Sequence, residues 1–89
     1  MISPEPQHVV RVVQALLDRP QSTIELRAGE FHQYDDAAAA RAIGDTLAAL
    51  ETDGAIAGPD AAGRYRLCTE RLDVQELVAA IKRYQEGRR

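Results

Sequence analysis

The feature that most constrains the fold is a helix end that leads directly into a β-hairpin. Apolar residues recur three or four positions apart up to Leu50, the spacing of one helix face, and Gly54 follows as a residue that readily ends a helix. Residues 58–63 are rich in glycine, proline and aspartate, which favours a turn. Residues 64–69 then alternate polar and apolar side chains, as a strand does. The sequence therefore predicts a helix, a sharp helix end and a hairpin over residues 55–69.

The predicted helix before the hairpin begins at Asp35 or Asp36, because a carboxylate there caps the first turn and lies at the positive end of the helix dipole. Ile56 is expected to make the hydrophobic contact that accompanies a helix ending at Gly54. Gly44 lies inside the helix and costs about 1 kcal/mol relative to alanine, which suggests that another helix approaches closely there. The expected buried stripe is Ala40, Ile43, Leu47 and Leu50.

The N-terminal segment predicts an amphipathic helix over residues 4–18. Ser3 is able to cap this helix, and Pro4 occupies the first helical position, where proline is favoured. Pro20 ends the helix, because proline disfavours helical geometry in the residue before it. The apolar stripe of this helix is Val9, Val12, Val13, Leu16 and Leu17.

The C-terminal segment predicts another amphipathic helix, over residues 73–86. Asp73 and Glu76 form an acidic variant of the capping box, and Gly87 closes the helix. The apolar stripe of this helix is Val74, Leu77, Val78, Ile81 and Tyr84. This stripe is larger than a thin domain obviously needs for its own core. An exposed stripe of that size usually finds a partner, so these residues predict a homodimer formed through this helix. The alternative is that the helix packs on the N-terminal helix of its own chain.

Residues 22–28 leave two interpretations open. Ser22 with Glu25 fits a capping box that opens a short helix. Ile24 and Leu26 also alternate with polar residues, which suits a short strand. We favour the helix, with room for one or two extended residues before it.

A chain of 89 residues predicts one domain, residues 1–89, with a thin core. The chain has 15 alanines and only four aromatic residues. Two of the aromatic residues, Phe31 and Tyr34, lie in a link between helices, and their rings are expected to fill the core. The single cysteine, Cys68, excludes an internal disulfide and a cysteine-rich metal site. No apolar run reaches the ~18 residues of a membrane span and no signal-peptide pattern is present, so we expect a cytoplasmic protein without membrane contact. The expected core is Val9, Val12, Val13, Leu16, Leu26, Ile43, Leu47, Leu50, Ile56 and Leu67.

The order helix, short element, helix, helix, two-stranded hairpin, helix resembles a winged-helix domain. The resemblance is most specific over residues 47–56 and 63–67, where two leucines one turn apart precede an acidic turn, a glycine and an apolar strand residue. It covers roughly residues 4–69 and implies a mainly α fold whose small β-hairpin, with two or three strands, is the wing. Small bacterial members are mostly transcription regulators that place the third helix in the major groove and the wing on the DNA backbone. The chain departs from the family at residues 29–34, because this link between the second and third helices is longer than a tight helix-turn-helix turn.

The resemblance implies double-stranded DNA as a partner, held mainly by the basic wing. Arg64 and Arg66 should face outward on the return strand while Tyr65 and Leu67 face inward. Arg71 and Arg41, the latter on the third helix, complete the expected DNA-binding set. Few phosphates are neutralised by so few cations, so affinity should fall with salt at a shallow log–log slope of about 2–3. A dimer would then place two wings ~34 Å apart, about one helical turn of DNA.

The third helix points instead to a protein partner. A base-reading helix needs several cationic or amide side chains, whereas Asp35, Asp36 and Asp45 would face phosphates here. Small side chains let a second helix approach closely and lose little entropy on burial. The alternative function is therefore a protein-interaction module whose partner face is Ala38, Arg41, Ala42, Asp45 and Ala49.

No residue pattern predicts catalysis. His32 lies near Asp35 and Asp36, but one imidazole and two acids in a loop form no recognisable ligand set, and capping explains the acids. Cys68 has no neighbouring base in sequence, and there is no serine nucleophile elbow or phosphate-binding glycine loop. A domain this small is also expected to have little room for a ligand pocket of ~300 Å³ or more. We therefore expect that the protein is not an enzyme and that it binds no metal and no cofactor.

Overall fold

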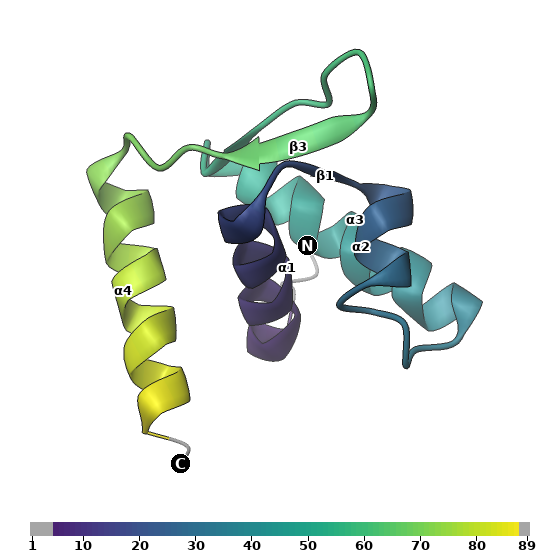
Figure 1. Cartoon of the computed structure of the whole chain (residues 1–89), viewed down its shortest axis with the longest axis horizontal. Coiled ribbons are helices and arrows are strands. Elements are labelled where there is room, and N and C mark those ends of the chain that lie inside the picture. Colours follow the sequence, from purple (N-terminus) through teal and green to yellow (C-terminus); the bar gives the residue numbers. More distant parts are fainter. Residues whose placement is uncertain (1–4, 88–89) are drawn as a thin grey trace.

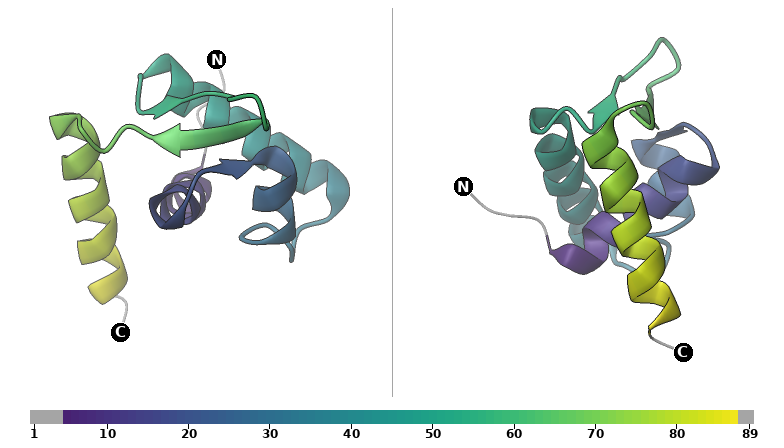
Figure 2. Two further views of the ribbon diagram at one scale, coloured as in Figure 1. Left: turned by 45° about the horizontal axis from the view of Figure 1, so that its top comes forward. Right: turned by 90° about the vertical axis from the view of Figure 1, so that its left-hand side faces the viewer.

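A computed structural model of the chain describes residues 5–87 and shows a mainly helical fold with a small antiparallel sheet (Figure 1). The sheet lies at one end of the three helices α1, α2 and α3, and α4 stands on the far side of α1 from α2 (Figures 1 and 2). The expected class, mainly α with a small β element, is confirmed. The elements are α1 (Pro6–Asp18), β1 (Gln21–Ser22), α2 (Thr23–Ala28), α3 (Asp36–Thr52), β2 (Ile56–Ala57), β3 (Arg64–Leu67) and α4 (Leu72–Glu86).

The sheet joins the predicted hairpin to a strand from the other end of the chain. Its order is β1-β3-β2, and β3 pairs antiparallel with both neighbours. Ser22 lies opposite Arg64, and Ile56 lies opposite Leu67. The favoured interpretation of residues 22–28, a short helix after one or two extended residues, is therefore confirmed, and the alternative strand through Ile24 and Leu26 is wrong.

Two local hydrogen-bond patterns fix the start of α2 and the end of α3. The Ser22 hydroxyl accepts a hydrogen bond from the Glu25 amide at 3.2 Å, and the Glu25 carboxylate accepts one from the Ser22 amide at 3.0 Å, which is a complete capping box. At the end of α3, Gly54 has φ 75° and its amide donates to Glu51 O at 3.0 Å. The Ala55 amide donates to Leu50 O at 2.9 Å, so the pattern is a Schellman motif. Ala55, rather than the expected Ile56, holds the position after the glycine.

Two expectations about helix ends and spacing need correction, and a third lies outside the described residues. Ser3 and Pro4 lie outside the described residues, and α1 begins at Pro6 after Glu5. The expected Asp73 cap is wrong, because α4 begins one residue earlier and no side chain caps it. Gly44 is exposed, and a Cβ placed there would meet nothing within 4 Å, so no helix among the described residues approaches it closely.

The core lies between α1, α2, α3 and the sheet. Nine of the ten residues expected in it are buried, and Val9 is half-buried. Phe31 is fully buried with 0% of its surface exposed, and Tyr34 packs beside it with ring centroids 5.3 Å apart. Ala40 was expected to be buried but is exposed. The buried residues of α3 are Ala39, Ala42, Ile43, Thr46, Leu47 and Leu50.

The burial pattern of α3 is shifted because its neighbours lie on more than one side. α3 packs against α1, α2 and β2 together. A helix enclosed in this way buries a face wider than its stripe of large apolar residues. Ala39 and Ala42 therefore enter the core on the same side of Ile43, although alanine gives little sign of burial in the sequence.

Candidate interaction surfaces

The β2–β3 hairpin, which the resemblance predicts to be the wing, carries the first group of predicted functional residues. Arg64 is exposed, and its Nε donates to Glu25 Oε1 at 2.9 Å. The two residues meet because β3, which carries Arg64, pairs with β1, and α2 with Glu25 follows β1 directly. The hydrogen bond from Arg64 and the one from the Ser22 amide hold the pKa of Glu25 at about 2, below its ordinary 4.5. The same pairing raises the pKa of Arg64. The charge of this wing arginine is therefore already matched by a carboxylate of α2.

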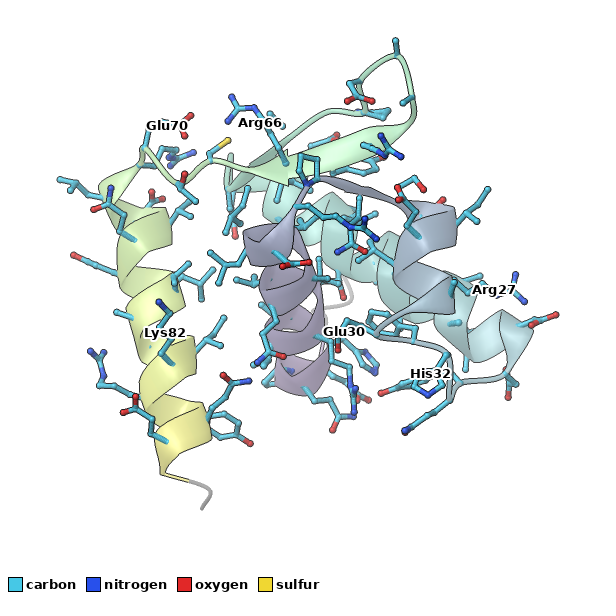
Figure 3. The ribbon with its side chains drawn as sticks, in the orientation of Figure 1. Arg27, Glu30, His32, Arg66, Glu70 and Lys82 are labelled. Atoms are coloured by element: carbon cyan, nitrogen blue, oxygen red, sulfur yellow. The ribbon has the colours of Figure 1, made fainter. Side chains whose placement is uncertain are left out.

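The other two basic residues near the wing also have acidic neighbours. Arg66 Nη1 lies 3.6 Å from Glu70 Oε1, and both side chains are more than half exposed, so this pair contributes little stability (Figure 3). Arg71 is more firmly held. Its Nη1 donates to the backbone oxygens of Asp53 and Gly54 at 3.1 and 2.6 Å, and its other nitrogens donate to the Asp73 carboxylate. Arg71 thus joins the end of α3 to the start of α4.

The outward face of α3 differs from the one expected. Ala38 and Arg41 are exposed as expected, but Asp45 and Ala49 are half-buried. Ala42 is a correction, because it is only 5% exposed and packs in the core between the neighbours of α3. A group of exposed residues spaced three or four positions apart lies along one side of the helix, made of Ala37, Ala40, Arg41, Gly44 and Ala48. We call these five residues the α3 face.

Charge on α3 is mainly acidic. Arg41 is the helix's single cation, against Asp36, Asp45 and Glu51. Asp36 forms an ion pair with Arg27 of α2, which neutralises the first of these acids. The Asp35 side chain accepts a hydrogen bond from the Ala38 amide at 2.8 Å, which confirms its capping role.

The apolar stripe of α4 is divided between core and surface. Val74 and Ile81 are 1% and 5% exposed and belong to the chain's own core, so they are not available to a second copy. Leu77 and Val78 are half-buried against that core. Tyr84 is 56% exposed. Most of the stripe therefore packs on the chain's own core, Tyr84 is the stripe residue that keeps the exposure expected of an interface, and the homodimer stays a prediction.

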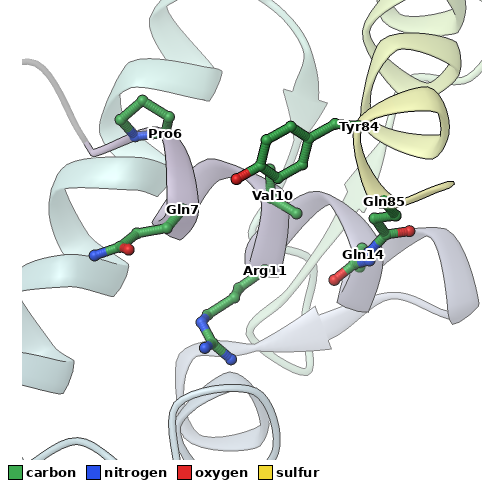
Figure 4. Close-up of a pocket in the computed structure, with 7 residues that line it drawn as sticks. All are labelled: Pro6, Gln7, Val10, Arg11, Gln14, Tyr84 and Gln85. Carbon is green, nitrogen blue, oxygen red and sulfur yellow. The ribbon is translucent and has the colours of Figure 1, made fainter. Parts of the chain in front are cut away.

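A groove between α1 and α4 is larger than expected, because the sequence predicted little room for a pocket of ~300 Å³ or more. Its volume is about 370 Å³, and the Tyr84 ring forms part of its wall (Figure 4). Sequence reasoning missed it because the groove depends on how α4, which follows β3 in the chain, lies beside α1. The lining residues are Pro6, Gln7, Val10, Arg11 and Gln14 from α1 and Tyr84 and Gln85 from α4.

The described residues contain neither a cluster of metal-ligating side chains nor a helix able to span a membrane. Among residues 5–87 no group of three or more histidine, cysteine, aspartate or glutamate side chains is placed to hold a metal. His32 Nδ1 instead lies 2.7 Å from the Gly29 oxygen at the end of α2. Over the same residues, no helix is both long enough and apolar enough to cross a bilayer.

Comparison with known proteins gives no relative for this chain. No family model matches it, and neither a curated protein nor a solved structure does. The function must therefore be argued from the surfaces themselves.

Proposed function

We propose that the chain is a winged-helix domain that binds another protein through the α3 face. The winged-helix assignment is supported by the order of α1, α2, α3 and the β2–β3 hairpin, and by the Schellman motif that leads from α3 into the wing. β1 completes a three-stranded wing by pairing with β3.

The observation that carries the proposal is the character of the α3 face. In a DNA-binding winged helix this face would meet the major groove, where bases are read by cationic and amide side chains and phosphates attract cations. Here four of its five residues are alanine or glycine, and Arg41 is its only charged residue. The half-buried Asp45 lies at its edge and would repel phosphates.

Gly44 adds a second argument. A glycine inside a helix costs about 1 kcal/mol relative to alanine, and nothing within 4 Å of its Cβ position requires it here. The residue therefore weakens the free chain without helping its packing. A partner helix that approaches the α3 face closely would use the space that glycine leaves.

Affinity capture from the source cells tests this proposal with matched variants. Ala48→Glu places a long charged side chain on the α3 face, and Ala80→Glu makes the same change at an exposed position of α4. We expect at least one protein to be captured by wild type and by Ala80→Glu but lost with Ala48→Glu. The same protein should bind Gly44→Ala more weakly. The proposal is wrong if no captured protein distinguishes Ala48→Glu from Ala80→Glu.

DNA binding is the second candidate function, and the exposed β3 surface favours it. Arg64 and Arg66 are two residues apart on one strand and both are exposed, so they project from the same side of the wing. Surface ion pairs contribute about 0–1 kcal/mol, so phosphates compete readily with Glu25 and Glu70 for these cations.

Fluorescence anisotropy with a mixed-sequence duplex at two salt concentrations separates the two candidates. If the wing binds DNA, Arg64→Ala together with Arg66→Ala should weaken binding to all sequences, and Glu25→Gln should strengthen it by releasing Arg64. Glu25→Gln keeps the capping box, because glutamine also serves at that position. Absence of binding by wild type at low salt would exclude the DNA function and leave the protein-binding one.

A further inference from the structure

One pair of charges at the α3 face has no partner within the described part of the chain. Arg41 is exposed, and Asp45 is half-buried one turn further along the helix. Within residues 5–87 neither side chain makes a hydrogen bond or an ion pair, whereas Asp36 of the same helix pairs with Arg27. Arg41 and Asp45 do not pair with each other, and a cation that precedes an acid by four residues is the weaker order for such a pair. Both charges are therefore available to a partner.

The positions of these two charges make the α3 face complementary to itself. Ala40, Gly44 and Ala48 are spaced four residues apart and form a ridge along the face. Arg41 and Asp45 both lie on the same flank of that ridge. When two identical helices meet antiparallel about a two-fold axis, this flank faces its own copy with the order of the residues reversed. With the axis at Gly44, Arg41 of one copy and Asp45 of the other lie about 3 Å apart along the helices, at about 1.5 Å per residue.

The residues around the axis allow the two helices to approach closely. Gly44 is exposed, and a Cβ placed there would meet nothing within 4 Å in its own chain. The exposed Ala40 and Ala48 lie one turn to either side of it. Side chains this small permit a separation at the short end of the ~8–10 Å that is usual between packed helices. At that separation the longer Arg41 side chain can reach across to the carboxylate of the other copy.

We propose that the partner of the α3 face is a second copy of this chain, bound antiparallel about a two-fold axis near Gly44. The inference rests on the protein-binding function proposed above and names its partner. Arg41 of each copy pairs with Asp45 of the other, so the dimer has two such ion pairs. A parallel dimer would bring opposite flanks together, so the charges select the antiparallel arrangement. Few and small side chains bury little area, so the dimer is transient, with a dissociation constant on the order of 100 µM.

Sedimentation equilibrium of charge-reversed full-length chains tests the proposal. Arg41→Glu places an acid against Asp45 of the other copy, and Asp45→Arg places a cation against Arg41. We expect wild type to dimerise, and each variant alone to dimerise at least tenfold more weakly at about 50 mM salt, where exposed charges are less screened than at physiological salt. Ala80→Glu changes an exposed position of α4 and should dimerise like wild type. A wild type that stays monomeric well above 100 µM would overturn the proposal.

A mixture of the two charge-reversed variants gives the sharpest result. In a mixed dimer the new glutamate of one chain meets the new arginine of the other, and the native Asp45 meets the native Arg41. The mixture should therefore dimerise about as strongly as wild type, which would also show that both variants fold. A mixture that associates no better than its components, or single variants that dimerise like wild type, would contradict the proposed pairing.

Failure of this inference can be distinguished from failure of the protein-binding function. If the chain itself is the protein captured by wild type and lost with Ala48→Glu, the capture experiment supports both. If the chain stays monomeric but a different protein is captured and is lost with Ala48→Glu, the α3 face binds that protein and only the self-pairing is wrong. If neither result is obtained, both proposals are wrong.

Discussion

Helices α3 and α4 have similar lengths and both carry an apolar stripe, yet α3 buries six of its 17 residues and α4 buries two of its 15. α3 is enclosed by α1, α2 and β2, so even Ala39, Ala42 and Thr46 lie inside. α4 stands at the side of the domain, where only Val74 and Ile81 are fully covered (Figure 1). The comparison teaches that the number of packed neighbours, more than the strength of the stripe, sets how much of a helix is buried.

The clearest way to break this comparison is to truncate one leucine in each helix. Leu47 of α3 is 5% exposed, and Leu47→Ala should lower the free energy of unfolding by about 2–5 kcal/mol. Leu77 of α4 is half-buried, so Leu77→Ala should cost about 1 kcal/mol. Urea unfolding monitored by circular dichroism measures both. Equal losses would show that α4 is as much a part of the core as α3.

A smaller effect is expected at the junction of the two helices. Arg71→Ala removes the hydrogen bonds to the Asp53 and Gly54 oxygens and to the Asp73 carboxylate, and should cost about 1–2 kcal/mol. Because α4 has few other anchors, its amides should lose hydrogen-exchange protection before those of α3 do. Arg71→Lys keeps the charge but not the fork of donors, and should restore protection only in part. A uniform loss across both helices would contradict a local role.

Replacing Gly44 in α3 is expected to stabilise the chain, whereas the leucine and arginine variants above are expected to destabilise it. Its Cβ position is open, so Gly44→Ala should raise the free energy of unfolding by about 0.5–1 kcal/mol through helix propensity alone. The reciprocal change in α4, Ala80→Gly, should lower it by a similar amount. Thermal unfolding of both variants beside wild type is the measurement. Destabilisation by Gly44→Ala would reveal a contact that open space does not predict.

The smallest effect concerns acid stability and the pair between Glu25 and Arg64. The pKa of Glu25 falls from 4.5 to about 2 in the folded chain, so the stability it contributes is complete above 4.5 and is lost as pH falls toward 2. Glu25→Gln keeps the capping box but should flatten the decline of the unfolding midpoint over that interval. Thermal scans at a series of pH values, from about pH 7 down through this interval, should show a smaller difference between variant and wild type below pH 4.5 than above it. A constant difference across the interval would contradict the assignment.

Features that depend only on residues close together in the chain could be predicted from the sequence alone. The capping box at Ser22 and Glu25, the Asp35 cap and the helix end at Gly54 all depend on residues within a few positions of one another. The alternation over β3 likewise predicted that Arg64 and Arg66 face solvent while Leu67 is buried. Such signals act within one turn or one strand, so they need no knowledge of the rest of the fold.

Tertiary structure alone decided the features that join distant residues. Only the pairing of β1 with β3 brings Glu25 to Arg64, 39 positions away, and only the junction of α3 with α4 gives Arg71 its backbone partners. The burial of Ala42 and of Val74, and the groove beside Tyr84, depend on which elements lie against each helix. The physical reason is that a side chain's spacing fixes the direction in which it points, whereas its burial and its ionic partner depend on what the rest of the chain places there.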